Sequence, residues 1–209
     1  MGYVVENWPF IMRLLGEHIW MTGAALFVST VIAVPLSLLL AQSEKLATAV
    51  LGLLSVLYTI PSIALLILLL PVFGLGRTAV VAALVVYSQI ILVRNMVVAW
   101  QSVSPQLLEA AAGVGMSGRQ RWWRVQLPLA MPIIIAGERV AAVVCVAIAT
   151  IGAKFGAGGL GTLLFDGIAQ NRYDKILWGT IFCALLAILL NQGLLWLESR
   201  VAPPLAQPS

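Results

Sequence analysis

The sequence predicts an all-α integral membrane protein with five transmembrane helices and a polar two-helix loop between the third and fourth. Of its 209 residues, 61% are hydrophobic and only 10% are charged, whereas soluble globular domains carry about 25% charged residues. Several charge-free runs are long enough to cross the hydrocarbon core of a bilayer, which takes about 20 residues. The seven tryptophans suit the aromatic belts at a membrane interface. Together these features exclude an ordinary soluble domain.

Composition also limits the classes of function. The net charge of +4 fits a protein face beside anionic lipid better than a nucleic-acid interface. Cys145 and Cys183 both lie in apolar runs, so we expect packing residues rather than a disulfide. His18 is the only histidine, no cluster has metal-ligand spacing, and the phosphate-loop pattern GxxxxGK[ST] is missing. We therefore expect no catalytic residue, no bound metal and no cofactor.

The first 17 residues mix aromatic and charged side chains and are expected to form an interfacial segment. Trp8 and Trp20 suit the headgroup region, and Pro9 suits the first turn of a helix. The pattern of a cleavable signal peptide, a basic region followed by a small-residue cleavage site, is not expected here. The next run, 19–42, carries no Asp, Glu, Lys or Arg. It predicts the first span, with a kink at Pro35.

The second predicted span covers 47–73, a longer charge-free stretch than one span needs. Pro61 and Ser62 interrupt its middle, so either one long helix is kinked or the helix is broken. Backbone that a proline frees at membrane depth must be satisfied by protein or by a water-lined path. Residues 58–62 are therefore a candidate lining of a transport pathway. The alternative is a packing kink that a neighbouring helix satisfies.

Three further spans are predicted at 78–100, 129–152 and 176–197. A polar segment, 104–128, connects the first two of these, and a glycine-rich segment, 153–175, connects the last two. The residues from Glu198 onward are expected to form a frayed tail. Five spans put the two termini on opposite sides of the membrane. The positive-inside rule does not decide which side is which, because the basic residues on the two sides tie. The cluster of arginines in the polar loop favours the cytoplasm for that loop.

The polar loop begins with signals for a short helix. Ser104 is a good capping residue, and Pro105 suits the first helical position, where its missing N–H costs nothing. Gly113 and Gly115 can end such a helix because glycine tolerates left-handed backbone angles. We expect one helix between these signals.

A second short helix is predicted directly after this turn. Ser117 and Gln120 have the spacing of a capping box, in which each side chain bonds the other residue's backbone N–H. Leu127 precedes Pro128, and the residue before a proline is disfavoured in the helical region. We expect the second helix to end there.

The run Gly156–Gly161, GAGGLG, matches the pattern GxGxxG. A dinucleotide site needs a preceding strand and a βαβ unit, and here the pattern follows a predicted span. We interpret it as a bend at which backbone approaches backbone closely.

Arg94, Glu138 and Arg139 lie inside predicted spans, where ionisable residues are costly and need partners in the bundle interior. Glu138 and Arg139 are neighbours in sequence and point in different directions, so they cannot simply pair with each other. We predict that Glu138 pairs with Arg94 or with a polar group of another span. A structural ion pair near the headgroups is favoured over a direct role in transport.

The polar loop also fits a longer pattern at every spacing: Glu-Ala-Ala, three residues, Gly, nine residues, an aliphatic residue, one residue and Leu-Pro. The matching residues are Glu109, Ala110, Ala111, Gly115, Val125, Leu127 and Pro128. This pattern resembles the EAA motif of ABC importer permeases.

Further stretches extend the resemblance over nearly the whole chain. They are YTIPSIALLILLLPVFGLG from Tyr58, RNMVVAW from Arg94, QLPLAMPIIIAG from Gln126 and GAGGLG from Gly156. Together they resemble the osmoprotectant branch of the methionine-permease-like superfamily, which transports glycine betaine, carnitine, choline or related compounds. Lys154 and Glu138 depart from the branch pattern, which has apolar residues there.

The resemblance implies that the polar loop couples the permease to a separate ATPase subunit on the cytoplasmic side. It also implies an amino terminus outside the cell and a carboxyl terminus in the cytoplasm, in the cytoplasmic membrane of a bacterium. The residues that would carry the coupling are Glu109, Ala110, Ala111, Gly115, Arg119, Arg121, Arg124, Leu127 and Pro128. The arginines would supply donors for carboxylates or lipid phosphates.

The same resemblance implies the remaining partners: an ATPase dimer, a second permease chain that is identical or paralogous, a solute-binding protein and membrane lipid. The candidate pathway residues are Tyr58, Pro61, Ser62, Tyr87, Arg94 and Glu138. Tyr58 and Tyr87 could contact a quaternary ammonium through their ring faces. One alternative is an ABC permease for an amino acid or another small polar solute. A secondary transporter and a membrane scaffold are less favoured alternatives. A secondary transporter usually shows internal repeats, and we find none in the sequence.

Overall fold

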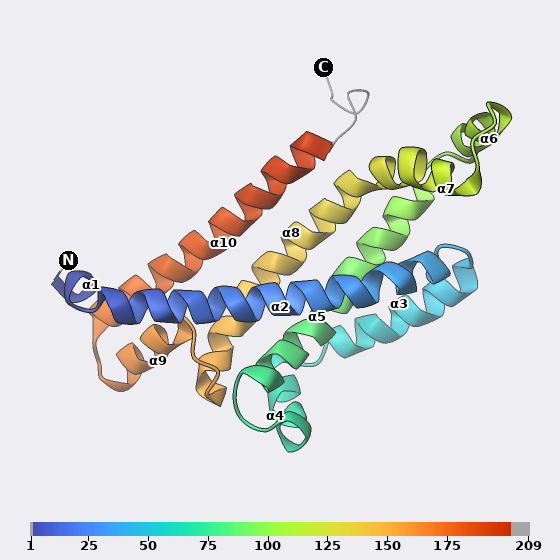
Figure 1. Ribbon diagram of the computed structural model, residues 1–209. Coiled ribbons are helices and arrows are strands. Elements are labelled where there is room, and N and C mark those ends of the chain that lie inside the picture. The colour runs from blue at the N-terminus through green and yellow to red at the C-terminus, as the bar shows by residue number, and fades with distance from the viewer. Residues whose placement is uncertain (1, 202–209) are drawn as a thin grey trace.

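The computed structural model describes residues 2–201, and every regular element in that range is a helix (Figure 1). In chain order the elements are α1 (Gly2–Glu6), α2 (Trp8–Leu40), α3 (Glu44–Tyr58), α4 (Ser62–Phe73), α5 (Arg77–Gln101), α6 (Pro105–Gly113), α7 (Gly118–Arg121), the π-helix η1 (Trp122–Gln126), α8 (Leu127–Gly152), the 3-10 helix η2 (Ala153–Phe155), α9 (Gly161–Ala169) and α10 (Tyr173–Val201). The prediction of an all-helical membrane protein is confirmed.

Four helical stretches of the described chain are long and apolar enough to cross a membrane. They are α2, α5, the continuous run Gly118–Phe155 and α10. The pair α3 and α4 is bent by 95° and adds a fifth if the two are taken as one span. The second predicted span, 47–73, is therefore a broken helix and not a kinked one.

The first helix is longer than the sequence suggested. It begins at Trp8, has Pro9 in its first turn and continues to Leu40, with Pro35 inside. The helix start expected at Pro9 is confirmed, and the helix runs without a break into the first predicted span. Its first turns are held by burial, because Ile11 and Leu14 are 0% and 2% exposed and belong to a buried apolar cluster with residues of α8, α9 and α10.

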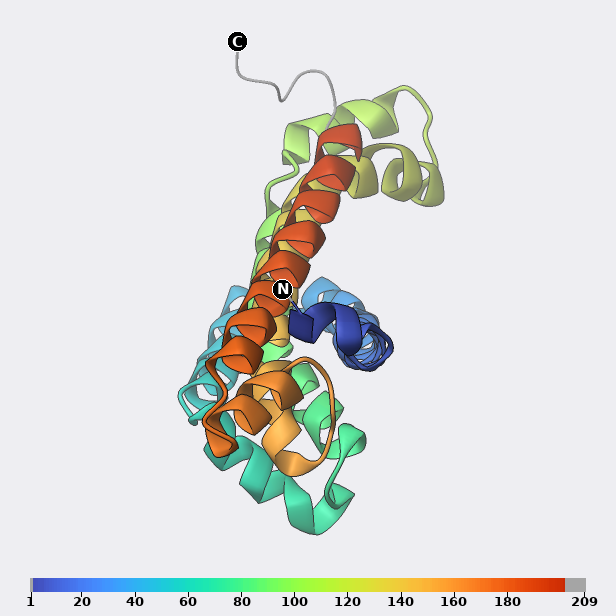
Figure 2. The same cartoon turned by 90° about the vertical axis from the view of Figure 1, so that its left-hand side faces the viewer.

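Helix α5 is the centre of the bundle and packs against α2, α3, α4 and α8. In the most apolar stretch of α5, 61% of the residues are buried, compared with 6% in the corresponding stretch of α10. Figure 1 shows α2 crossing the direction of α8 and α10 obliquely, and in Figure 2 α2 is seen nearly end-on while α8 and α10 run up the page. The helices α6 and α7 and the end of α10 lie at one end of the bundle, and α4 and α9 lie at the other.

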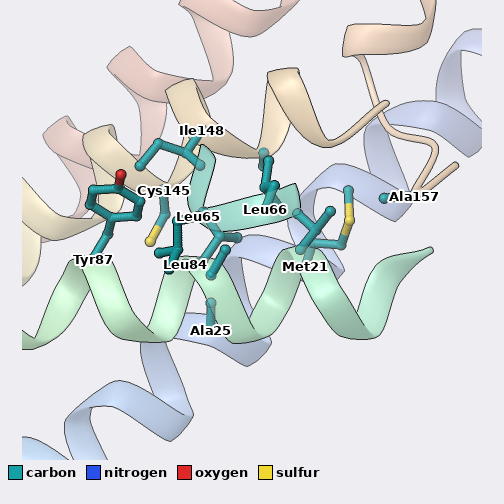
Figure 3. Close-up of a cluster of buried hydrophobic side chains, with 12 residues drawn as sticks. Met21, Ala25, Leu65, Leu66, Leu84, Tyr87, Cys145, Ile148 and Ala157 are labelled. Carbon is teal, nitrogen blue, oxygen red and sulfur yellow. The ribbon is translucent and has the colours of Figure 1, made fainter. Parts of the chain in front are cut away.

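Small residues permit the close approach of the central helices. A Cβ added at Gly152 of α8 would lie 2.7 Å from a methyl of Val80 of α5, and one added at Gly137 would lie 2.7 Å from Cβ of Asn95. Buried side chains of α2, α4, α5 and α8 form an apolar cluster where these four helices meet (Figure 3). Among them are Met21, Ala25, Leu65, Leu66, Leu84, Tyr87, Cys145 and Ile148.

The last third of the chain adds detail to one expectation and corrects another. The glycine-rich segment 153–175 contains a helix, α9, which packs on α10 and α8. Residues 198–200, expected to be frayed, continue α10 to Val201. Glu198 holds this end in place through an ion pair with Arg139 of α8, with 2.5 Å between Nη1 and Oε2. The rest of the expected tail, 202–209, lies outside the described residues.

Candidate functional site

Residues 104–128, hereafter the coupling loop, project from one end of the bundle between α5 and α8 (Figure 1). The first helix, α6, begins at Pro105, with Ser104 at the capping position. The side chain of Ser104 does not cap the helix, because its hydroxyl donates to the side-chain oxygen of Gln106 instead. Proline alone therefore marks this helix start.

The turn after α6 depends on a single left-handed glycine. Gly115 has φ of 85°, whereas Gly113 is the last residue of α6 and has no positive φ. The expectation that both glycines adopt left-handed angles was wrong for Gly113. A side chain at 115 would be strained, because L-residues rarely adopt that backbone conformation.

The predicted capping box is confirmed. The backbone N–H of Gln120 donates to Ser117 Oγ at 3.3 Å, and the Ser117 N–H donates to Gln120 Oε1 at 2.8 Å. The expected stop at Leu127-Pro128 was wrong. Helix α7 passes through the π-helix η1 directly into α8, because Pro128 lies in the first turn of α8, where it tolerates a missing N–H.

The candidate coupling residues differ in exposure. Glu109, Ala110, Gly115, Arg119 and Arg124 are exposed, Arg121, Leu127 and Pro128 are half-buried, and Ala111 is buried within the loop. Trp122 packs the loop against the bundle, because its ring centroid lies 5.1 Å from that of Trp100 of α5. The outer surface of the loop thus offers one carboxylate and two guanidinium groups on a framework fixed at both ends.

A second candidate site lies beside the break between α3 and α4. A cavity of about 320 Å³ is lined by Ser55, Tyr58, Ile90, Ile91, Arg94, Asn95 and Val140. Two of the predicted pathway residues, Tyr58 and Arg94, are thus brought together, and we call this the Tyr58–Arg94 cavity. Tyr87 adjoins it, because its ring makes an edge contact with Tyr58 at 5.5 Å between centroids.

The break itself is supported by protein. Tyr87, 5% exposed, donates its hydroxyl to the carbonyl oxygen of Ile60. Thr59 bonds back to the carbonyl of Val56 at 2.7 Å. Pro61 is exposed and Ser62 is half-buried, and neither lines the cavity. A neighbouring helix, α5, therefore satisfies the Ile60 carbonyl, and the role of residues 58–62 as a pathway lining stays a prediction.

Glu138 does not pair with Arg94. Its Oε1 accepts a hydrogen bond from Thr30 of α2 at 2.5 Å, which is the other predicted outcome, a polar group of another span. Glu138 lines a separate apolar groove with residues of α2, η1 and α10, whereas Arg94 lines the Tyr58–Arg94 cavity. The two side chains are separated because they lie on different faces of the bundle. Arg139 points to α10 and meets Glu198 and Asn191.

A polar network at the opposite end of the bundle from the coupling loop was missed. Glu17 Oε1 pairs with Arg77 Nη2 at 2.7 Å, and Glu17 Oε2 accepts the N–H of Gly159 at 3.0 Å. Arg77 also donates to the carbonyl of Ala157 at 3.3 Å. The network ties α2 and α5 to residues 156–161, hereafter the glycine loop. The signal was available in sequence, since Glu17 and Arg77 each stand at the edge of a charge-free run.

His18 belongs to the same region and is fully buried. Its Nδ1 lies 3.3 Å from the N–H of Leu160, and its Nε2 lies 3.2 Å from the carbonyl oxygen of Val146. The ring therefore bridges α8 and the glycine loop. The expected close backbone approach is also present: a Cβ at Gly161 would lie 1.9 Å from the carbonyl oxygen of Thr150. In residues 2–201 no group of three His, Cys, Asp or Glu is placed to hold a metal.

Several curated proteins are similar to this chain over almost its full length. An osmoprotectant import permease protein, OsmW, of Salmonella typhimurium is 38% identical over 204 residues, which cover 95% of this chain and 93% of that protein. The carnitine transport permease OpuCB of Listeria monocytogenes is 36% identical and covers 95% and 91%. The glycine betaine/carnitine/choline permease OpuCB of Bacillus subtilis is 32% identical and covers 97% and 94%.

Solved structures share the fold at low sequence identity. A structure of inward-facing conformations of the MetNI methionine ABC transporter matches with a TM-score of 0.80 at 22% identity, over 92% of this chain and 96% of that one. An amino acid ABC transporter with histidines matches with a TM-score of 0.76 at 19% identity, over 95% and 97%. A family model described as binding-protein-dependent transport system inner membrane component matches residues 33–206, and the chain belongs to this family.

Proposed function

We propose that this chain is the permease subunit of an ATP-driven importer for small osmoprotectants such as glycine betaine, carnitine or choline. The observation that carries this proposal is the 38% identity to an osmoprotectant import permease over 95% of the chain. A carnitine transport permease and a choline transport permease are similar to this chain over comparable lengths.

The coupling loop is the proposed docking element for a partner ATPase subunit, which hydrolyses the ATP. Its exposed Glu109, Arg119 and Arg124 supply charged groups for such a contact. The capping box at Ser117 and the stacking of Trp122 on Trp100 hold the loop in one shape. A preformed loop loses little conformational entropy on docking, which favours a stable contact.

This docking implies the orientation of the chain. The coupling loop and the end of α10 would face the cytoplasm, and α4, α9 and the glycine loop would face outward, where a solute-binding protein delivers its cargo. The described ends of the chain, at Gly2 and Val201, belong to these opposite sides in the proposal. A second permease chain would complete the assembly and enclose the transport pathway between the two chains.

The proposed pathway runs along the face that carries the Tyr58–Arg94 cavity. This face combines the helix break, a half-exposed Tyr58 and the exposed Arg94 with apolar side chains such as Val56 and Val140. An ionisable residue inside a span is a functional candidate by default. Glu138 faces away from this cavity, so we assign it to the contact between α2 and α8 and not to the pathway.

The proposal is tested by purification and reconstitution. The chain is expressed together with candidate ATPase and binding-protein subunits, and the complex is placed in proteoliposomes loaded with ATP. Uptake of radiolabelled glycine betaine, carnitine and choline should require ATP and the binding protein, and methionine and histidine serve as control solutes. If no ATPase co-purifies, or if uptake is selective for an amino acid, the proposed function is wrong.

A further inference from the structure

The Tyr58–Arg94 cavity has the chemistry of a small-molecule site. Its volume of about 320 Å³ lies at the lower end of the range for ligand pockets. Apolar walls come from Ile90, Ile91 and Val140, and polar groups come from Ser55, Tyr58, Arg94 and Asn95. Polar groups placed beside apolar walls can fix the orientation of a bound ligand.

Arg94 is the cationic group of the cavity. It lies about two turns before the end of α5 and is exposed. The ion pairs formed within residues 2–201 join Glu17 to Arg13 and Arg77, Arg139 to Glu198 and Arg172 to Asp174. Arg94 takes part in none of them. A guanidinium in a span that no carboxylate of the described chain neutralises is suited to an anionic group brought by a ligand, which it can bind with two parallel hydrogen bonds.

Tyr58 is the aromatic group of the cavity. It is the last residue of α3 and is 42% exposed. Its ring meets the ring of Tyr87 at an interplanar angle of 75°, and Tyr87 is itself fixed by its hydrogen bond to Ile60. The orientation of Tyr58 is thus set by a buried neighbour. A quaternary ammonium binds favourably over the face of such a ring.

Among the described residues that line the cavity, Arg94 is the only charged one. Ser55 donates its hydroxyl to the carbonyl of Leu51 at 2.7 Å, and Asn95 donates its side-chain N–H to the carbonyl of Ile91 at 2.7 Å. The Ser55 hydroxyl proton and one of the two Asn95 amide N–H groups are therefore engaged by their own helices. Within the cavity, the guanidinium supplies the positive charge and the Tyr58 ring supplies the negative face of an aromatic quadrupole.

We infer that the Tyr58–Arg94 cavity binds zwitterions, with the ligand carboxylate on Arg94 and its quaternary ammonium against Tyr58. This inference rests on the proposed function and names its substrate class more narrowly. Glycine betaine and carnitine carry both groups. Of these two groups, choline carries only the ammonium. The Arg94 guanidinium repels that ammonium, and choline has no carboxylate whose attraction to Arg94 would offset the repulsion. The permease thus favours carboxylate-bearing solutes over choline independently of the choice made by the binding protein.

The test measures uptake of glycine betaine, carnitine and choline by the reconstituted complex with the variants Arg94→Gln, Arg94→Lys, Tyr58→Leu and Tyr58→Phe. Arg94→Gln should lower the ratio of betaine uptake to choline uptake at least tenfold, and Arg94→Lys should restore most of it. Tyr58→Leu should lower uptake of all three solutes by a similar factor, and Tyr58→Phe should retain it. Arg200→Gln removes the same charge at the end of α10, outside the cavity, and should leave the ratio unchanged.

Four outcomes overturn the inference. Equal loss of all solutes with Arg94→Gln would show that Arg94 pairs with a second permease copy or a lipid phosphate. Uptake of all three solutes that Arg94→Gln leaves unchanged would show that the guanidinium does not contact the solute. A wild-type complex that transports choline but neither zwitterion would overturn the inference and leave the proposed function standing. A wild-type complex that transports none of the three would reject the proposed function, and the inference with it.

Discussion

The hydroxyl of Tyr87 on α5 donates a hydrogen bond to the carbonyl oxygen of Ile60, in the break between α3 and α4. This contact explains how a bend of 95° persists in an apolar part of the chain. At membrane depth water is scarce, so a carbonyl outside the helical ladder needs a protein donor.

The variant Tyr87→Phe should destabilise the permease, because it leaves the Ile60 carbonyl unsatisfied at a cost of about 1–3 kcal/mol. The apparent melting temperature in detergent should fall by several degrees, at about 2–4 °C per kcal/mol for a chain of this length. Tyr58→Phe is the matched control, since the Tyr58 hydroxyl makes no hydrogen bond to residues 2–201. Equal melting temperatures for the two variants would contradict this role of Tyr87.

The turn of the coupling loop predicts a contrast between two glycines. Gly115→Ala places a Cβ on a residue with φ of 85° and should distort the loop, at a cost of about 1–2 kcal/mol. Gly113→Ala, at the end of α6, should be neutral or stabilising, because its backbone is helical and no atom lies within 4 Å of the added Cβ.

The measurement for this pair is ATP-driven uptake together with the amount of co-purified ATPase. Gly115→Ala should lower both severalfold, and Gly115→Asp should lower them further. The permease itself should still be recovered from the membrane in normal amount, because the turn lies outside the buried core. Full uptake by Gly115→Asp would rule out the coupling loop as the ATPase contact.

The bond between Thr30 and Glu138 predicts that Glu138 acts through packing between α2 and α8. Glu138→Gln keeps a side-chain oxygen that can accept from the Thr30 hydroxyl, so uptake and protein yield should stay within about twofold. Glu138→Ala removes the acceptor and leaves a gap, and it should lower the melting temperature. Loss of uptake in Glu138→Gln with normal protein yield would instead assign Glu138 to transport.

The network around Glu17 predicts the protection of the glycine loop. Glu17→Ala removes both the acceptor of the Gly159 N–H and the partner of Arg77. Hydrogen exchange of the amides in residues 156–161 should then become at least tenfold faster, which corresponds to about 1.4 kcal/mol. Arg13→Ala is the control. The Arg13 side chain is mostly exposed, and its Nε lies 4.0 Å from Glu17 Oε1, which is too far for a hydrogen bond. Exchange that Glu17→Ala leaves unchanged would show that other contacts, those of His18 and Arg77, hold the loop without Glu17.

The coupling loop illustrates what sequence alone could predict. The spacing of Ser117 and Gln120 is local, and a local capping box forms wherever both side chains can reach the backbone. Pro128 shows the limit of the same reasoning. A proline disfavours the helical conformation of the residue before it, but η1 and the first turn of α8 tolerate the missing N–H. Local preference could not decide between ending the helix and passing through it.

The ionisable residues show a different limit. Their cost at membrane depth predicted that Glu138 would find a partner, and it did. The sequence could not say which one, because the faces of α5 and α8 that meet are determined by packing at Gly137 and Gly152. Glu198 was assigned to a tail for the same reason: its partner, Arg139, lies 59 residues earlier in the chain.

The unbroken helical path from Gly118 to Phe155 has a mechanical consequence. Its 38 residues correspond to a rod of roughly 57 Å, which joins one side of the coupling loop to the glycine loop without a flexible joint. On its other side the coupling loop meets α5 through residues 102–104, which lie outside the helices. If the loop docks on an ATPase subunit as proposed, a displacement of the loop would reach α8 through continuous helix, and α5 through the non-helical connection and the contact between Trp122 and Trp100.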